Sequence, residues 1–241
     1  QVLGWEPHYG GVKVVTDQDE YHADKLVVTA GAWAGRLIPE LAGLAVPERQ
    51  VLAWLQPQKP EHFHRDRFPV FNLLVDEGRY YGFPQFAVPG FKFGRYHHFE
   101  EIVDPDEWER DPNADDERVL REFAARYFPD GAGPTMMLKS CMFTNTPDRH
   151  FILDLHPEFP QVVVASPCSG HGFKFASVVA DLAERGQTRH DIRLFQLRRF
   201  TDPAFQLDGV PTGAAIHTPV QPAVQVQTRK SGSTNDIQTF W

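Results

Sequence analysis

Residues 138–175 decide how this chain folds, and they read LKSCMFTNTPDRHFILDLHPEFPQVVVASPCSGHGFKF. Cys141 lies in a strand-like run, and residues 162–165 form an apolar strand. The turn at 170–172 follows and opens a helix at Phe173. A strand, a glycine turn and a helix N-terminus together present backbone N–H groups to a ligand. The stretch therefore predicts a βα unit with a ligand-binding turn.

A second unit of this kind lies near the N-terminus. Residues 25–29 (KLVVT) are a β-branched apolar run, residues 30–32 supply a glycine turn, and a helical run follows over 33–41. Pro39, late in that run, would end or kink the helix. A hairpin is expected over residues 11–21, where apolar and polar residues alternate around a turn. Two βα units predict a layered α/β domain.

Strand candidates without intervening helices separate the two units. They lie at 51–55, 70–75, 79–83 and 90–96. Strands joined by short polar turns predict an antiparallel sheet. An amphipathic helix is expected after an acidic loop, with an apolar face made of Val119, Leu120, Phe123, Ala124 and Tyr127.

The order of these elements predicts a mixed α/β fold, of α+β character, with two domains. Residues 1–45 and 138–200 would form a discontinuous layered α/β domain, and residues 46–137 an inserted antiparallel-sheet domain. Residues 201–241 have no clear period and are expected to be an irregular tail. A cleft between the two domains is the expected ligand site.

Composition excludes several classes of function. The chain has 241 residues and a net charge of −8, which argues against a general affinity for nucleic acid or anionic membranes. No apolar run approaches the roughly 20 residues of a membrane helix, and no signal peptide is visible. Two cysteines are too few for a disulfide scaffold. A cytoplasmic protein is expected, and neither G-x-G-x-x-G nor a P-loop is present.

A few residues invite a chemical interpretation, each beside a plainer one. Cys141 is either a buried strand residue or a nucleophile. Lys174, between two phenylalanines at a helix start, is either solvated or able to bind a carboxylate. Lys92, opposite the phenylalanines of GFKFGRY, is either exposed or directed at the cleft. The His62–His64 pair lacks a third ligand at motif spacing, so no metal site is expected.

Separate stretches together resemble one family. They are ADKLVVTAGAWAGRL, RYYGFPQF, GFKFGRYHHFEEIVDPD, KSCMFTNTPDRHFILDLHP and SGHGFKFASV, and they span about residues 23–180. In this order they resemble the monomeric sarcosine oxidase and N-methyl-L-tryptophan oxidase family, FAD-dependent amine oxidases of the D-amino-acid-oxidase-like superfamily. The resemblance implies a partial FAD-binding α/β domain with an inserted substrate-binding sheet.

The resemblance also implies a reaction. The chain would be the C-terminal portion of an oxidase that demethylates N-methyl amino acids with oxygen, giving amino acid, formaldehyde and hydrogen peroxide. Oxidation of another secondary amine, such as a fructosyl amino acid or pipecolate, is an alternative within the class. A catalytically silent fragment, or a half that depends on a partner, is an alternative outside it.

The family pattern assigns roles to residues. Cys141 matches the cysteine that bonds covalently to FAD. The other residues that match cofactor-binding positions are Thr29, Ala30, Gly31, Trp33, Gly170, His171, Gly172 and Phe173. Lys174 matches a lysine that binds the substrate carboxylate, and Lys92 matches a lysine near flavin N5 that promotes the reaction with oxygen. Tyr81 and His97 match residues that line the substrate pocket.

The chain departs from the family pattern in two ways. Arg95 looks like an extra residue, and on a flat strand it would place Lys92 and His97 on opposite faces. A bulge would restore them; otherwise Tyr96 takes the position of His97. The resemblance also covers only about the last three-fifths of a family member. The family's N-terminal ADP-binding part is expected to be missing, and a separately supplied N-terminal FAD-binding segment is one expected partner.

Overall fold

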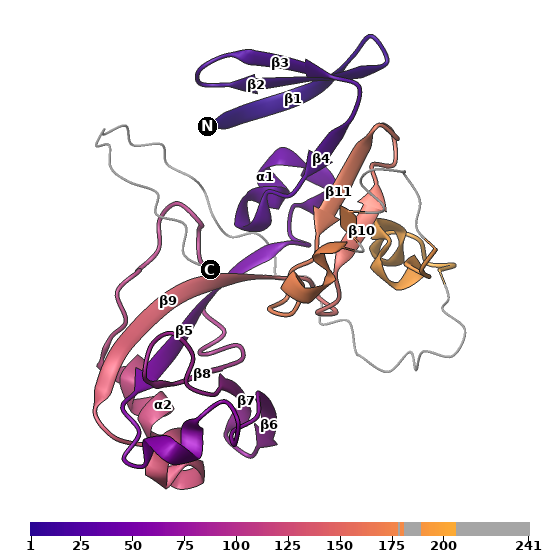
Figure 1. Cartoon of the computed structure of the whole chain (residues 1–241). Helices are drawn as coiled ribbons and strands as arrows, with labels where there is room; N and C mark the ends of the chain where they lie inside the picture. Colours follow the sequence, from indigo (N-terminus) through magenta and orange to yellow (C-terminus); the bar gives the residue numbers. More distant parts are fainter. Residues whose placement is uncertain (178, 181–188, 206–241) are drawn as a thin grey trace.

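The computed structural model describes residues 1–177, 179–180 and 189–205, which form three β-sheets and a few helices (Figure 1). The first sheet is an antiparallel meander of β1 (Val2–His8), β2 (Gly11–Thr16) and β3 (Glu20–Ala23). Tyr9 and Gly10 both have positive φ, as a tight turn between antiparallel strands requires. The antiparallel pairing of β2 with β3 confirms the hairpin predicted over 11–21.

The second sheet has the order β10 (Ile152–Leu155), β11 (Val162–Ser166) and β4 (Leu26–Val28). β11 pairs with β4 in parallel and with β10 antiparallel. Every residue of β11 is buried, as expected for a continuous apolar strand inside a sheet. The strands predicted over 25–29 and 162–165 are thus neighbours.

The helical run predicted over 33–41 is interrupted at Ile38, as expected from Pro39, and its first turn is 3-10 rather than α-helical. The structure has a 3-10 turn, η1 (Gly31–Trp33), a four-residue helix, α1 (Ala34–Leu37), and a second 3-10 turn, η2 (Pro39–Leu41). Ile38 between them is extended, with φ −124° and ψ 100°. Pro39 explains the break, because proline disfavours helical geometry in the residue before it.

The third sheet has the order β6 (Phe71–Val75), β7 (Gly78–Phe83), β8 (Phe91–Arg95), β5 (Val46–Leu55) and β9 (Thr135–Asn145). All four pairings are antiparallel, as predicted for the strands β5 to β8; the pairing of β9 with β5 was not predicted. Figure 1 shows β9 as a long curved strand that runs from the end of the molecule near α2 toward β10 and β11. β9 crosses position 138 without a break, and the division into domains there stays a prediction.

Helix α2 (Ala114–Tyr127) covers one face of this sheet. Asn113 caps it with hydrogen bonds from the backbone N–H groups of Asp115 and Asp116, and Asp116 completes a capping box. The predicted amphipathic helix is therefore confirmed. The core beneath it includes Val51, Ala53, Leu55, Tyr80, Phe91, Phe93, Leu120, Phe123 and Ala124.

Short 3-10 turns complete the described chain. They are η3 (Pro60–Phe63), η4 (Pro129–Gly131), η5 (Phe173–Phe175), η6 (Arg193–Phe195) and η7 (Leu197–Phe200). The helix predicted from Phe173 begins with η5 and has α-helical positions at 176, 177, 179 and 180; its expected stop, Gly186, lies outside the described residues, as do residues 206–241 of the expected tail. No helix in the described ranges is long and apolar enough to cross a membrane.

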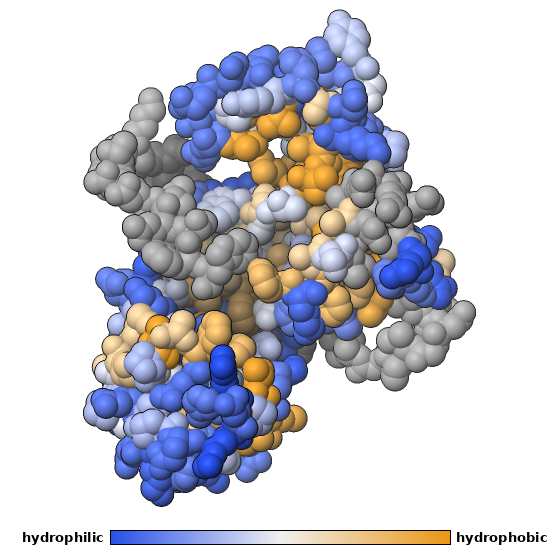
Figure 2. Space-filling model, viewed as in Figure 1, coloured by the Kyte–Doolittle hydropathy of each residue, from blue (hydrophilic) through white to orange (hydrophobic). Residues whose placement is uncertain are grey.

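The fold is thus a mixed α/β structure in which strands dominate and helices are few. In Figure 2 apolar residues gather beneath the β1–β3 meander, whereas the outer surface of the meander and of the region around α2 is mostly hydrophilic. The apolar residues of the parallel strands and α1 form a separate core from the one beneath α2.

Candidate active site

The third sheet has two chemically different faces. One face packs against α2, and Phe91 and Phe93 lie there with 0% exposure. Because side chains alternate along a strand, Lys92 points to the opposite face. Lys92 pairs with Trp54 in β5 and with Phe83 in β7. Cys141 pairs with Gln50 further along β5, so it lies on the face that carries Lys92.

The ammonium group of Lys92 lies between aromatic rings. Its Nζ is 4.8 Å from the centre of the Trp54 ring and 5.3 Å from that of Phe83. Both contacts are attractive cation–π interactions. They hold the cation over the sheet, half-buried, as the alternation of GFKFGRY predicts.

Tyr81 lies on the same face as Lys92 and pairs with Gly94 in the neighbouring strand β8. A Cβ atom at Gly94 would lie 2.7 Å from the Tyr81 Oη, so the glycine leaves the space that the phenol occupies. Burial raises the pKa of Tyr81, and the neighbouring Cys141 and Tyr96 act in the same direction. Tyr81 is therefore a neutral hydrogen-bond donor at physiological pH.

Cys141 is a half-buried free thiol. Burial raises its pKa, and the positive charge of Lys92 opposes that shift. Lys92 thus favours the thiolate, which is the nucleophilic form of cysteine. Electrostatic coupling to both Tyr81 and Lys92 places the three predicted site residues in one neighbourhood.

The bulge that would align Lys92 with His97 is not present. β8 keeps a regular register with both neighbours and ends at Arg95. The Tyr96 ring lies against Tyr81, with ring centres 5.0 Å apart, so Tyr96 occupies the face. His97 adopts a left-handed φ of 52° and turns toward Glu48, with Nδ1 3.0 Å from Oε1. The assignment of the pocket position to His97 or Tyr96 stays a prediction.

The turn after β11 is brought to the same face by β9. Gly170 has φ +76°, and a Cβ there would lie 2.5 Å from a ring carbon of Phe143, which is two residues beyond Cys141. Ser169 donates its backbone N–H to the carbonyl of Thr144 at 2.9 Å. The glycine turn therefore packs directly on the strand that carries the thiol.

Inside that turn the close backbone approach is to the protein itself. A Cβ at Gly172 would lie 1.4 Å from the carbonyl oxygen of Pro167, so only glycine fits. His171 Nδ1 lies 2.7 Å from the carbonyl oxygen of Ser169. Phe173 is 80% exposed, and Lys174 is exposed with Nζ 5.3 Å from the centre of the Phe175 ring. The carboxylate role of Lys174 stays a prediction.

The other predicted cofactor segment follows β4. Since β4 and β11 are parallel neighbours, Thr29–Gly31 and the 170–172 turn both follow the carboxyl ends of adjacent strands. Ligands of open α/β sheets bind at that edge. Thr29 is exposed and Ala30 half-buried. Gly31 has φ +52° and open space where a Cβ would lie, which fits the close approach of a flat cofactor ring.

Trp33 has a partner that the sequence did not reveal. Its Nε1 donates a hydrogen bond to Asp106 Oδ1 at 2.8 Å. Arg36 pairs with Asp106 and with Asp104, its Nη2 lying 2.7 Å from Asp104 Oδ1. These bonds tie the turn after β4 to the acidic loop that follows β8. The sequence analysis linked neither Trp33 nor Arg36 to this loop, because the contact joins segments about 70 residues apart.

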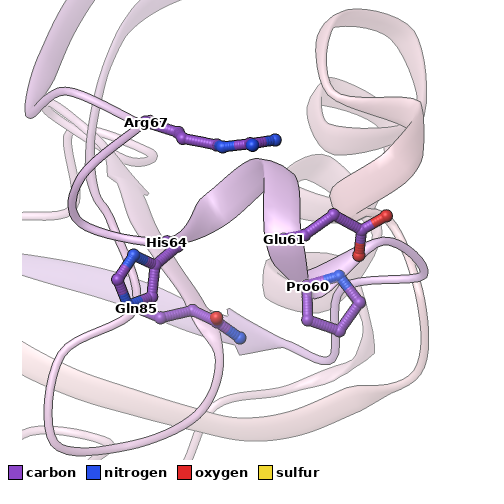
Figure 3. Close-up of a pocket in the computed structure, with 5 residues that line it drawn as sticks. All are labelled: Pro60, Glu61, His64, Arg67 and Gln85. Atoms are coloured by element: carbon purple, nitrogen blue, oxygen red, sulfur yellow. The ribbon is translucent and has the colours of Figure 1, made fainter.

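None of the residues that line the surface hollow in Figure 3 is a predicted site residue. The hollow is lined by Pro60, Glu61, His64, Arg67 and Gln85 around η3. His62 pairs with Asp130 at 3.0 Å and His64 with Asp66 at 3.2 Å, so the two histidines of EHFH have separate partners. No group of three metal-ligating side chains occurs within the described ranges.

Comparisons with known proteins assign the chain to a family. The family model described as FAD dependent oxidoreductase matches residues 1–185. The chain is 41% identical over 197 residues to monomeric sarcosine oxidase from Bacillus sp. (strain NS-129), covering 78% of this chain and 50% of that protein. It is 35% identical over 207 residues to N-methyl-L-tryptophan oxidase from Yersinia pestis (strain Pestoides F), covering 83% and 54%.

The fold has solved relatives as well. The open form of NikD, an amino acid oxidase of nikkomycin biosynthesis, superposes with a TM-score of 0.63 at 21% identity, over 81% of this chain and 53% of that one. The chain spans about half the length of the curated relatives it matches. The match over residues 1–185 shows that the chain belongs to the FAD dependent oxidoreductase family.

Proposed function

We propose that the chain is the C-terminal portion of an FAD-dependent oxidase that demethylates N-methyl amino acids of the sarcosine or N-methyl-L-tryptophan type. The observation that carries the proposal is the placement of Cys141, Lys92 and Tyr81 on one face of the third sheet. Similarity to sarcosine and N-methyl-L-tryptophan oxidases supports the choice of substrate.

The residues present fit a flavin. Cys141 offers a thiol beside a cation, the 170–172 turn packs on its strand, and Gly31 leaves open space at the carboxyl end of β4. In the proposal Cys141 forms a covalent bond to the flavin ring, while Thr29, Ala30, Gly31, Trp33 and the residues 170–173 contact the cofactor. Bound FAD would supply the hydride acceptor and pass the electrons to oxygen.

The side chains then have separable tasks. Lys174 binds the substrate carboxylate through a charge-assisted hydrogen bond. Tyr81, a neutral donor, and His97 line the substrate pocket. Lys92, fixed between Trp54 and Phe83, stabilises the negative charge that develops when oxygen accepts an electron. The overall reaction consumes the N-methyl amino acid, oxygen and water and yields amino acid, formaldehyde and hydrogen peroxide.

Acid precipitation tests the cofactor part of the proposal. The purified chain is incubated with FAD and precipitated, and flavin absorbance is measured in the pellet. We expect a yellow pellet and a flavin mass on the Cys141 peptide. Cys141→Ser should abolish both, whereas Cys168→Ser, at the second half-buried cysteine, should preserve them. A colourless wild-type pellet would overturn covalent attachment in this chain.

Peroxide release tests the reaction. Sarcosine, N-methyl-L-tryptophan, a fructosyl amino acid and pipecolate are offered in parallel to the flavin-loaded chain. We expect peroxide with one of the N-methyl amino acids, and formaldehyde in equal amount. If only the fructosyl amino acid or pipecolate were oxidised, the proposed substrate class would be wrong. Flavin binding without any turnover would identify a silent fragment or a half that needs a partner.

A further inference from the structure

In two pairs of consecutive residues, the two side chains lie on opposite faces of the third sheet, near the C-terminal end of β9. Glu48 and Arg49 are consecutive in β5 and therefore point to opposite faces. His97 and His98, just after β8, divide in the same way. His98 and Arg49 bond to Asp116 on the α2 side, whereas His97 and Glu48 meet on the side of Lys92. The pairing of His97 with Glu48 thus belongs to the candidate active site.

The Glu48 carboxylate is buried, with 8% exposure of the residue, and it is fully engaged. His97 Nδ1 lies 3.0 Å from Oε1 and 3.2 Å from Oε2. Asn145 Nδ2 donates to Oε2 at 2.8 Å, and Gln50 Nε2 donates to Oε1 at 2.5 Å. Among the described residues the ion-pair partner of Glu48 is His97, and no lysine or arginine takes that place. Two side-chain amides thus satisfy part of the buried carboxylate, and its remaining partner is the imidazole of His97.

The backbone of His97 adds an independent observation. Its φ of 52° lies in the left-handed region, which residues with a side chain seldom adopt. Such a conformation persists where the surroundings fix it, and it clusters at functional sites. Here it turns the ring from the course of β8 toward Glu48, while the ring centres of Tyr96 and Phe143 both lie 6.4 Å away.

We propose that Glu48 is the positioning residue of His97. The carboxylate holds Nδ1 and fixes the ring, which leaves Nε2 as the nitrogen that contacts the substrate. Asn145 and Gln50 in turn hold the carboxylate. The role rests on the proposed oxidase function, because it assigns His97 to the pocket of that enzyme. It would explain why His97 belongs to the site although Tyr96 occupies the strand position.

A direct test needs no cofactor. The whole chain is labelled with 15N-histidine, and the proton on His97 Nδ1 is observed by NMR. We expect a hydrogen-bonded proton that exchanges slowly with water. Glu48→Ala should abolish this signal, whereas Glu48→Gln, which keeps an acceptor oxygen, should shift it. A signal that persists unchanged in Glu48→Ala would overturn the proposal.

The chain offers a matched control. Glu40 contacts the buried His156 at 3.4 Å, next to Trp5 and away from the Lys92 face. Glu40→Gln should leave the His97 signal unchanged. If Glu40→Gln removed it as well, the signal would report general loosening of the fold, and the assignment to Glu48 would be wrong.

Turnover separates positioning from a merely structural role. In the flavin-loaded chain, Glu48→Gln should lower kcat/KM for the N-methyl amino acid by about a hundredfold, because a small displacement of a substrate-contacting group has that effect. Flavin content and thermal midpoint should match those of Glu40→Gln, and Glu48→Asp should recover part of the loss. Unchanged kcat/KM in Glu48→Gln, together with a shifted His97 signal, would overturn the proposal and leave the oxidase function standing. A wild-type chain that shows the signal but oxidises no amine would support the contact and refute the function.

Discussion

Arg49 and Asp116 lie 67 positions apart in the sequence, yet two hydrogen bonds join them, at 2.9 Å and 2.7 Å. Their exposures are 2% and 0%, so the pair is buried between β5 and the first turn of α2. Burial raises the pKa of the Asp116 carboxyl, but hydrogen bonds from Arg49 and from the Asn113 backbone outweigh it, and that pKa lies below its usual value. The pair anchors the helix behind the face that carries Lys92.

Asp116→Asn should lower the free energy of unfolding by about 3–5 kcal/mol, because it leaves the buried Arg49 charge without its partner. Urea denaturation measures the change. Asp115→Asn, at the exposed neighbouring position, is the control and should change stability by less than about 0.5 kcal/mol. Equal small effects of both substitutions would show that the pair contributes little.

His98 should make stability depend on pH. Burial lowers its pKa below the ordinary 6.5, and Arg49 and Arg95 act in the same direction, while Asp116 opposes them. The unfolded chain therefore binds this proton at a higher pH than the folded chain does, and stability falls as pH drops below about 6.5. Asp116 stays ionised there, because its pKa is lowered.

His98→Gln removes that titration and keeps a side-chain N–H donor for Asp116. The loss of unfolding free energy between pH 7 and pH 5 should shrink in this variant. His62→Gln makes the same substitution at an exposed histidine and is the control for the substitution itself. A profile for His98→Gln that overlays the wild type would rule His98 out as its source.

Lys92→Met should separate the two halves of the proposed reaction. Reduction of the bound flavin by an N-methyl amino acid should persist, while reoxidation by oxygen slows by about a hundredfold, since the cation that stabilises developing negative charge is gone. Stopped-flow absorbance measures both rates. Lys139→Met removes an exposed cation from the same face and should leave reoxidation intact. Normal reoxidation in Lys92→Met would refute the oxygen role.

Gly172→Ala should disrupt the 170–172 turn, because the new Cβ would lie 1.4 Å from the Pro167 carbonyl oxygen. That oxygen belongs to the backbone and cannot move aside without displacing the chain. We expect a loss of at least about 3 kcal/mol in unfolding free energy and loss of flavin retention. Gly31→Ala meets open space and should cost only about 1 kcal/mol for its left-handed φ. If both variants retained flavin and stability, the turn would not be the rigid element inferred here.

Several local features were predictable because they depend on neighbours in the chain. The amphipathic helix α2 and the β6–β7 antiparallel pairing follow from short-range patterns. The alternation of Phe91, Lys92 and Phe93 set their faces correctly. The break in the helical run over 33–41 was predictable too, because Pro39 makes Ile38 extended. The bulge near Arg95 is not present, because the chain leaves the strand there and uses a left-handed residue.

The sequence by itself determined the residue types, the elements and the faces of single strands, since a period of two is a local property. It also carried the resemblance that singled out Cys141, Lys92 and the 170–173 turn. Only the tertiary structure decided which strands are neighbours, and hence that Cys141 shares a face with Lys92, that Trp33 bonds to Asp106 and that His97 meets Glu48. Register depends on pairing between segments far apart in the chain, and no local pattern specifies a partner at such a distance.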